Sequence, residues 1–450
     1  MGVRVSKFGG SSLADAGQIG KALEIVRADD RRRYVVPSAP GKCHREDNKI
    51  TDLLLRCHRQ ASQGESIDDS FAAVSNRFIK IEADLGLNIG MAGLLEEIRK
   101  QLLEEVSASR GPAYIASRGE HLNGRLVAAA LDIPFIDPID QILFNDLGQL
   151  QREATYERLG STLKKHQRAV IPGFYGGGPD GRVMVFSRGG SDVTGSIVAR
   201  SVQAELYENW TDVSGLLMAD PRIVKNPRRI ESLTYRELRE LSYMGATVLH
   251  DEAVFPVREA AIPVEVRNTN APDEPGTLIV PTENAGEVTT PVTGIAGRRD
   301  FTIIAVEKAL MNSEVGFGRK LLSVIEEQGI CFEHMPSGID TMSIVLRDDL
   351  VSGKIVQIVD GIRQAVNPDN IEVFPDIALI ATVGRGMAKQ TGTAARLMNA
   401  LAQANVNIRM IDQGSSELNI IVGIEAEDFE VALNAIYHAF VPKAAADQAG

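Results

Sequence analysis

Residues 3–12 read VRVSKFGGSS, a short apolar run that ends in Lys7, Gly9 and Gly10. The glycines let backbone N–H groups approach an anion, and a helical pattern that begins near Ala14 adds the positive potential of a helix N-terminus. Lys7 adds a full positive charge. The segment therefore predicts a phosphate cradle at the end of a buried strand, although a purely structural turn would use the same glycines.

A second segment, SRGGSD at 187–192, repeats this order after the apolar run 183–186. Arg188 offers a planar fork for a carboxylate or phosphate oxygen. Asp192 could bind a substrate ammonium or orient a catalytic group. Alternatively, it is only a carboxylate at a helix N-terminus that interacts favourably with the helix dipole. Because ligands bind outside the carboxyl ends of parallel strands, we expect both turns to face one crevice.

Apolar runs alternate with helical patterns through the first two-thirds of the chain. This order predicts an α/β fold with a mainly parallel sheet sandwiched by helices. Residues 47–106 have helical periodicity and predict a helical insertion in front of the sheet. The expected buried strands are 3–8, 34–37, 113–117, 134–137, 169–172 and 206–210.

The last third of the chain repeats itself. A shift of 76 positions pairs Gly316 with Gly392 and Leu321 with Leu397 without a gap. Each copy reads as a ferredoxin-like βαββαβ unit, with strands expected at 301–307, 330–336, 341–347 and 371–374 in the first copy. The Pro/Gly-rich stretch 270–297 is expected to connect domains. The predicted organisation is an α/β domain at 1–285, a linker at 286–300, repeat units at 301–375 and 376–440, and a tail at 441–450.

The composition excludes several classes of protein. A chain of 450 residues with a formal net charge of −12 lacks the electrostatic footprint of a protein that binds nucleic acid or a membrane surface. No secretory signal or apolar run of membrane-spanning length is present, so a cytoplasmic location is expected. Cys43, Cys57 and Cys331 have no CxxC spacing, and the chain has no HExxH cluster. We expect neither a disulfide framework nor a metal site formed by protein side chains.

Six short motifs occur in one order along the chain: KFGGSS at 7–12, SRGE at 117–120, SRGGSD at 187–192, WTDVSG at 210–215, DPR at 220–222 and GATVLH at 245–250. Over residues 2–440 the sequence resembles the aspartokinases, members of the amino-acid kinase superfamily with a carbamate kinase-like fold. Its C-terminal repeats resemble paired ACT domains. The resemblance implies transfer of the γ-phosphate of ATP, which arrives with Mg²⁺, to the side-chain carboxylate of L-aspartate. The products are 4-phospho-L-aspartate and ADP, in the first step of lysine, threonine and methionine biosynthesis.

The resemblance also implies roles for individual residues. Lys7 and Asp212 are the implied catalytic residues. The implied aspartate-binding residues are Ser38, Thr51, Glu120, Arg188 and Asp192, and the implied nucleotide-binding residues are Lys7, Gly9, Gly10, Ser11, Thr211, Asp212, Arg222 and Thr247. A carboxylate acceptor is ionised near neutral pH and needs no general base, so no catalytic role is expected for His121 or His250.

The paired ACT units imply an amino-acid effector, lysine or threonine, and a homo-oligomer, dimer or tetramer, formed through these units. The implied effector-binding residues are Gly316, Phe317, Glu333, Ser337 and Asp340. An effector carboxylate would meet the helix N-terminus and its ammonium the acidic groups. In the alternative reading, the glycines only make the turn and the modules only dimerise.

Three positions depart from the family pattern. Thr247 stands where relatives commonly carry lysine, and Leu217 where some carry tyrosine. A charged loop before Thr51 contains Lys42, Arg45 and Lys49, which either replace the missing lysine or are solvated. Two other functions stay open: a kinase that accepts glutamate or another small acid, and an inactive kinase domain in a ligand-sensing protein.

Overall fold

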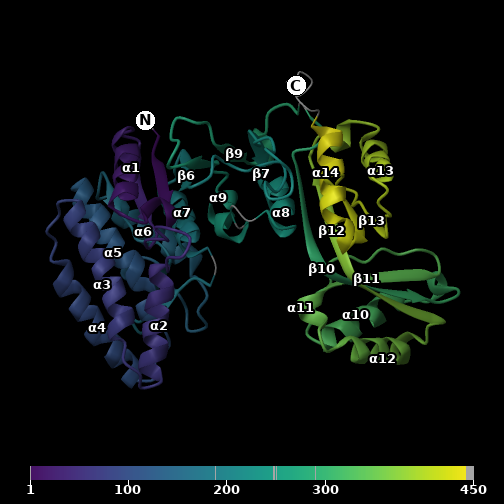
Figure 1. Cartoon of the computed structure of the whole chain (residues 1–450), viewed down its shortest axis with the longest axis horizontal. Helices are drawn as coiled ribbons and strands as arrows, with labels where there is room; N and C mark the ends of the chain where they lie inside the picture. The colour runs from purple at the N-terminus through teal and green to yellow at the C-terminus, as the bar shows by residue number, and fades with distance from the viewer. Residues whose placement is uncertain (1, 188, 247–248, 250, 289, 442–450) are drawn as a thin grey trace. The chain divides into compact units, whose positions relative to one another are not determined.

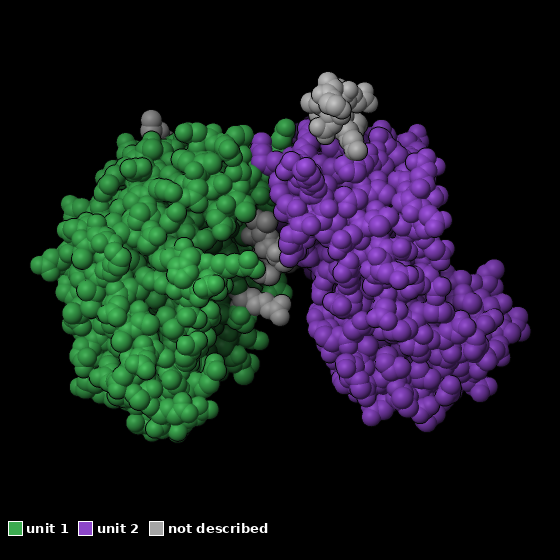
Figure 2. Space-filling model, in the orientation of Figure 1, with its two compact units in different colours: residues 1–216, 231–235, 248–285 green, residues 217–230, 236–247, 286–450 purple. Residues whose placement is uncertain are grey.

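The computed structural model describes residues 2–187, 189–246, 249, 251–288 and 290–441. The chain forms two compact units, which are coloured separately in Figure 2. The first contains residues 1–216, 231–235 and 248–285, and the second contains 217–230, 236–247 and 286–450. None of the helices in these described ranges is long and apolar enough to cross a lipid bilayer.

The first unit contains a seven-stranded sheet in the order β3-β2-β1-β6-β8-β9-β7. Neighbouring strands pair in parallel except β8 and β9, so the expected mainly parallel sheet is confirmed. The strands are β1 (Arg4–Phe8), β2 (Arg32–Pro37), β3 (Ala169–Val170), β6 (Leu206–Thr211), β7 (Ser232–Thr234), β8 (Val264–Asn268) and β9 (Thr277–Val280).

Helices cover both faces of this sheet (Figure 1). On one face, a single hydrophobic core joins α1 (Ala16–Arg27), α2 (Ile50–Ser62), α3 (Asp68–Asp84), α4 (Met91–Ser107) and α5 (Ala113–Leu131) to Phe8, Val35 and Trp210 of the strands. On the other face, α7 (Gly190–Ser201) packs against β1 and β6, with α6 (Arg152–Leu163) and α9 (Phe255–Glu259) beside it. Residues 47–106 therefore contain three helices, as their periodicity predicted.

Three expected strands are different in the structure. Residues 113–117 form the first turns of α5, because a run of five mostly apolar residues does not distinguish a strand from the buried side of a longer helix. Residues 134–137 make a single bridge between Phe135 and Val170, and 330–336 make one between His334 and Val345, instead of regular strands. Within 270–297, strand β9 belongs to the sheet and β10 begins at Gly294.

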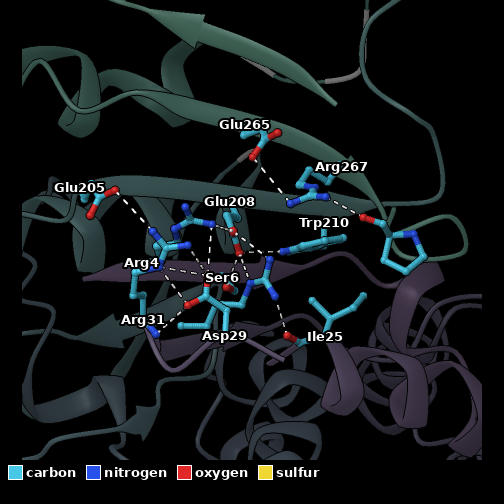
Figure 3. A network of polar contacts seen from close by, with 12 residues as sticks. Arg4, Ser6, Ile25, Asp29, Arg31, Glu205, Glu208, Trp210, Glu265 and Arg267 are labelled. Carbon is cyan, nitrogen blue, oxygen red and sulfur yellow. Dashed lines mark hydrogen bonds and ion pairs between the residues drawn. The ribbon is translucent and has the colours of Figure 1, made fainter. Parts of the chain in front are cut away.

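A buried network of charges fixes the centre of the sheet (Figure 3). The Glu208 side chain, fully buried, accepts hydrogen bonds from Ser6 Oγ at 2.8 Å and from Arg32 Nε at 2.8 Å. Arg4 Nη1 and Trp210 Nε1 donate to the same carboxylate at 3.2 and 3.1 Å. The network joins β1, β2 and β6 on the face opposite Lys7, since adjacent residues of a strand point to opposite faces.

The second unit is built around two long strands, β10 (Gly294–Glu307) and β12 (Asn370–Val383) (Figure 1). They pair with each other along their length, and the sheet order is β11-β10-β12-β14-β13. Gly316 and Gly392, matched by the 76-residue offset, both cap a helix with positive φ, at 83° and 86°. Beside these strands the C-terminal repeats contain β11 (Thr341–Arg347), β13 (Met410–Asp412), β14 (Asn419–Glu425), α10 (Phe317–Glu327), α11 (Asp348–Val351), α12 (Ile355–Val366), α13 (Thr393–Gln403) and α14 (Phe429–Phe440). The predicted repeat is thus a structural repeat.

Helix α8 (Tyr235–Tyr243) lies almost entirely in the second unit, although it precedes β8 and β9 of the first in sequence. Glu237 accepts hydrogen bonds from Thr293 Oγ1 at 2.7 Å and from the Arg385 backbone at 3.0 Å. Glu240 accepts one from Asn419 at 2.6 Å. The helix is therefore bonded to strands or loops of the C-terminal repeats.

Candidate active site

The carboxyl ends of β1 and β6 bring three polar side chains together against α7. Lys7 Nζ lies 2.6 Å from Asp192 Oδ1 and 3.4 Å from Asn209 Oδ1. Asn209 Nδ2 donates to Asp192 Oδ1 at 2.9 Å. Lys7 and Asn209 are directly opposite each other in the parallel register of β1 and β6. The structure thus joins two predicted residues, and it favours Asp192 as the group that orients the Lys7 ammonium.

The glycine turn after β1 packs against the loop after β2 with no room for side chains. Gly9 N donates to the Trp210 carbonyl at 2.9 Å, and Gly41 N donates to the Gly10 carbonyl at 2.8 Å. A Cβ on Gly41 would lie 2.6 Å from the Gly10 carbonyl carbon. Close backbone approach therefore requires glycine at position 41 and leaves little room at Gly10, where a Cβ would lie 3.0 Å from the Ala39 carbonyl oxygen, whereas a Cβ on Gly9 would make only ordinary contacts, the nearest at 3.5 Å.

The helix expected to begin near Ala14 contributes less to this turn than the sequence suggested. Ser11 opens a three-residue 3-10 turn, η1 (Ser11–Leu13), and α1 begins only at Ala16. Asp15 already caps α1 by accepting a hydrogen bond from Gln18 N at 2.9 Å. The expected donor Gly9 N is already engaged by the Trp210 carbonyl, so the cation and donors left for a phosphate here are Lys7 and the backbone amides of Gly10 and Ser11.

Helix α5 contributes a buried acidic group to the same edge of the sheet. Burial raises the pKa of Glu120 to about 8, and a hydrogen bond from the Ala39 backbone opposes the rise. Glu120 Oε2 and Asn123 Oδ1 are both buried and have no hydrogen-bond partner among the described residues, and they lie one helical turn apart on one face of α5. Asn123 Nδ2 donates to the Ser38 carbonyl at 2.7 Å. Two unsatisfied acceptors side by side suit a ligand rich in N–H donors.

Phe174 has a backbone conformation that bulky residues rarely adopt, with φ of 82°. Its N–H donates to Thr194 Oγ1 of α7 at 3.0 Å, and Gly190, at the start of α7, leaves room for its ring. Such local strain concentrates at functional sites. Phe174 and Asn209 were missed from the sequence, since no short motif marks either residue. Asn123 had a usable signal, its position three residues after Glu120.

His121 is close to this site, but its ring is fully engaged. Nδ1 lies 3.0 Å from the Tyr175 hydroxyl, and Nε2 accepts from Arg125 Nε at 2.9 Å. Burial lowers the pKa of His121. These contacts give the ring a structural role on α5.

The other predicted site residues differ in how far the structure brings them to this edge. Thr51 lies in the first turn of α2, and Thr211 ends β6 with its hydroxyl 3.1 Å from Asp212 Oδ1. Arg222 belongs to the second unit, where it is exposed and paired with Asp220 at 2.6 Å. The predictions for Arg188, Thr247 and His250 lie outside the described residues.

The charged loop before Thr51 is exposed at Lys42, Arg45 and Lys49. Its base is anchored by Asp47, whose carboxylate lies 2.6 Å from Arg77 Nη2 of α3. The loop thus presents cations to solvent from a fixed base.

The predicted effector-binding residues lie around α10 and the turn before β11. Gly316 caps α10, and the Phe317 ring is buried in the hydrophobic core of the first repeat. Glu333 accepts a hydrogen bond from Tyr243 of α8 at 2.5 Å. Asp340 accepts one from the Leu310 backbone at 2.9 Å, and both Ser337 and Asp340 are exposed. Phe317 therefore has only backbone groups to offer an effector.

Comparisons with known proteins agree with this geometry. Residues 2–268 match the model of the amino acid kinase family, and 380–440 match an ACT domain. Aspartokinase 3 of Bacillus subtilis is 40% identical, covering 97% of this chain and 98% of its own. The crystal structure of Clostridium acetobutylicum aspartate kinase has a TM-score of 0.91 at 51% identity, covering 98% of this chain and 100% of its own. Escherichia coli aspartokinase III, solved with aspartate and ADP, has a TM-score of 0.75 at 26% identity, covering 97% and 99%.

Proposed function

The chain belongs to the amino acid kinase family, among its aspartokinases, and from this membership we propose how its residues carry out the reaction. The enzyme transfers the γ-phosphoryl group of ATP to the side-chain carboxylate of L-aspartate. A bond forms between a carboxylate oxygen and the γ-phosphorus, the bond from that phosphorus to the bridging oxygen breaks, and ADP leaves. The expected fold class and activity are thereby confirmed.

The observation that supports the acceptor best is the pair of unsatisfied acceptors on α5. An aspartate ammonium carries three N–H donors, which suit Glu120 Oε2 and Asn123 Oδ1. Binding a cation also favours the ionised form of Glu120, whose pKa burial raises to about 8 in the free protein. Glu120 and Asn123 therefore fix the amino group and leave the side-chain carboxylate free to face the phosphate.

Lys7 is the group that acts on the transferring phosphoryl. Phosphoryl transfer needs little covalent assistance, so positioning and neutralisation of the phosphate oxygens account for most of the rate. Asp192 and Asn209 hold the Lys7 ammonium at the end of β1, and we propose that the backbone amides of Gly10 and Ser11 in the following turn donate to the same phosphate. MgATP is the substrate form we propose, with the metal held largely by phosphate oxygens.

We further propose that the nucleotide contacts Thr211, Asp212, Arg222 and Thr247, and that Ser38, Thr51 and Arg188 line the aspartate site. The ACT repeats would bind an end-product amino acid, lysine or threonine, near Gly316, Glu333, Ser337 and Asp340. The family precedent is E. coli aspartokinase III, which was solved in complex with lysine and aspartate. Homo-oligomerisation through the ACT repeats belongs to the same proposal.

The proposed acceptor is tested by steady-state kinetics with L-aspartate and L-glutamate in parallel at saturating MgATP. One additional methylene changes a well-fitted site by about 1–3 kcal/mol, so kcat/KM should favour aspartate by about 10- to 200-fold. Equal values, or a preference for glutamate, would reject aspartate as the specific acceptor.

A further inference from the structure

Beyond the kinase site, the first unit contains a cavity of about 890 Å³ at the N-terminal end of α5. It is lined by the end of α4, the start of α5, Asp137 and Ile139, residues 145–146, and residues 178–184, which form the turn between β4 (Tyr175–Gly177) and β5 (Val183–Val185) and the start of β5. Lys7, Ser38 and Glu120 are not among its lining residues. The described residues of the proposed aspartate site therefore do not line this cavity.

Arg118 is the unusual residue of this cavity. It is 8% exposed, and its guanidinium lies 4.6 Å from the centre of the Tyr114 ring and 5.2 Å from that of Tyr175. Nε and Nη2 donate to the Ser117 hydroxyl at 3.1 and 2.9 Å. Within the described part of the chain, no carboxylate forms an ion pair with it. Burying a guanidinium without an anion is costly, and two aromatic faces offset only part of that cost.

The charges around Arg118 indicate which kind of anion fits. The other two lining arginines are already neutralised, Arg110 by Glu105 at 2.7 Å and Arg182 by Asp180. Two further carboxylates, Asp137 and Asp146, also line the cavity. The lining carboxylates therefore outnumber the lining arginines, and they would repel a phosphate or nucleotide, which carries about two or more negative charges.

We propose that this cavity binds a free α-amino acid as a zwitterion, with its carboxylate on Arg118. The planar guanidinium fork matches a carboxylate, and the ammonium group would take the acidic side of the cavity near Asp137 and Asp146. The site would be a second amino-acid site of the kinase unit, on the same helix as Glu120 and independent of the ACT repeats.

The test is a titration of the full chain, labelled with ¹³C at its methionine methyl groups, with glycine as the probe. Met184 lines the cavity, so its methyl resonance, assigned with Met184→Leu, should shift and saturate as glycine is added. The methyl resonance of Met342, in the second unit, is the comparison: a shift of Met184 without a shift of Met342 assigns the binding to the first unit. Absence of a saturable Met184 shift in the parent protein overturns the proposal, whatever the variants do.

Variants assign the shift to Arg118. Arg118→Met should weaken glycine binding by about 10- to 100-fold, as expected for loss of a hydrogen-bonded charge, and Arg118→Lys should fall between it and the parent. Arg182→Met, a matched change of a paired lining arginine, should stay within about twofold, as should Glu120→Gln. An unchanged titration in Arg118→Met, its loss in Glu120→Gln, or tighter binding of inorganic phosphate than of glycine would each overturn the proposal.

Discussion

Lys7 is the residue on which the proposed chemistry depends most. Lys7→Ala should lower kcat by about 10²- to 10³-fold, because the Lys7 charge stabilises the phosphate oxygens most in the transition state, while the phosphoryl group is being transferred. Nucleotide affinity, measured by calorimetry, should fall much less. Lys21→Ala is the matched control, since Lys21 is an exposed lysine of α1 that contacts only Asn270 among the described hydrogen-bond partners. Unchanged turnover in Lys7→Ala would remove Lys7 from the site.

Glu120 gives the site a pH dependence with a definite sign. Because burial raises its pKa to about 8, the carboxyl is mostly protonated below that pH in the free enzyme, and only the ionised form attracts an ammonium. The kcat/KM for aspartate should therefore rise with pH and level off above about 8. Glu120→Gln should remove this rise and lower the plateau by about 10- to 100-fold.

The same raised pKa makes Glu120 a source of instability. The folded state holds this proton more tightly than the unfolded chain, so the group lowers stability increasingly as pH rises from its ordinary value of 4.5 towards 8. Ligand-free Glu120→Gln should consequently unfold at a higher temperature than the parent at a pH of about 8.5. A flat kcat/KM profile in the parent, or an identical rise in the variant, would contradict the assigned role.

At this scale the sequence identified the charged residues but not the neutral ones that place them. Lys7, Glu120 and Asp192 stand in recognisable motifs, whereas Asn209 belongs to a strand whose pairing with β1 is known only once the chain is folded. Phe174 is likewise recognisable only by its positive φ. Long-range register and backbone strain leave no short pattern in a sequence.

Among the elements, the turn after β1 should be sensitive to a single methyl group. Gly41→Ala would place a Cβ 2.6 Å from the Gly10 carbonyl carbon, so the turn or the loop after β2 must move. We expect kcat/KM for MgATP to fall by about tenfold or more, since small displacements at a reacting group are costly. Gly20→Ala, in α1 with open space around it, should leave kinetics unchanged and stabilise by up to about 1 kcal/mol. Equal kinetics in the two variants would exclude this packing constraint.

The charge network behind β1 and β6 should make a large contribution to the stability of the sheet. Glu208→Ala leaves the buried Arg32 without its anion and should cost about 3–5 kcal/mol. Urea unfolding followed by the fluorescence of Trp210, the only tryptophan of the sequence, reports this unit directly. Glu265→Ala is the control, because its carboxylate is 3.9 Å from Arg267 and partly exposed, and should cost under about 1 kcal/mol. Similar losses in both variants would contradict the network's importance.

Elements were predicted well where their periodicity was long and poorly where it was short. The helices of 50–107 and the repeat helices α10 and α13 follow from several turns of amphipathic pattern. Residues 113–117 gave too short a run, and α5 includes them because its buried face continues through Leu126 and Val127. The error matters, because α5 contains Glu120, Asn123 and Arg118.

For the whole molecule, regulation is the part that the sequence placed least precisely. Helix α8 occurs within the region that matches the kinase family, yet Glu237, Glu240 and Tyr243 bond to the C-terminal repeats. A sequence pattern does not show which surface such a helix joins. These hydrogen bonds give the kinase sequence a direct physical connection to Glu333, one of the proposed effector residues.

Asp340→Ala tests the proposed effector site. Uninhibited kcat should stay within about twofold, while the concentration of lysine or threonine for half inhibition should rise by about tenfold or more. The reason is that the substitution removes the exposed carboxylate proposed to hold the effector's ammonium group. In the structure this carboxylate accepts a hydrogen bond from the Leu310 backbone. Asp360→Ala, an exposed acid of α12, is the control. If the effector inhibits the parent and Asp340→Ala equally, or does not inhibit the parent at all, Asp340 is not part of an effector site.

The central claim is that this chain phosphorylates the side-chain carboxylate of L-aspartate, and trapping the product tests it most directly. The full chain is incubated with MgATP, L-aspartate and hydroxylamine, and the acyl hydroxamate is identified by mass spectrometry. We predict aspartate β-hydroxamate in amounts equal to the ADP formed, reduced by about 10²-fold or more in Lys7→Ala. Folded protein that forms no aspartate-dependent hydroxamate at millimolar substrate would contradict the claim.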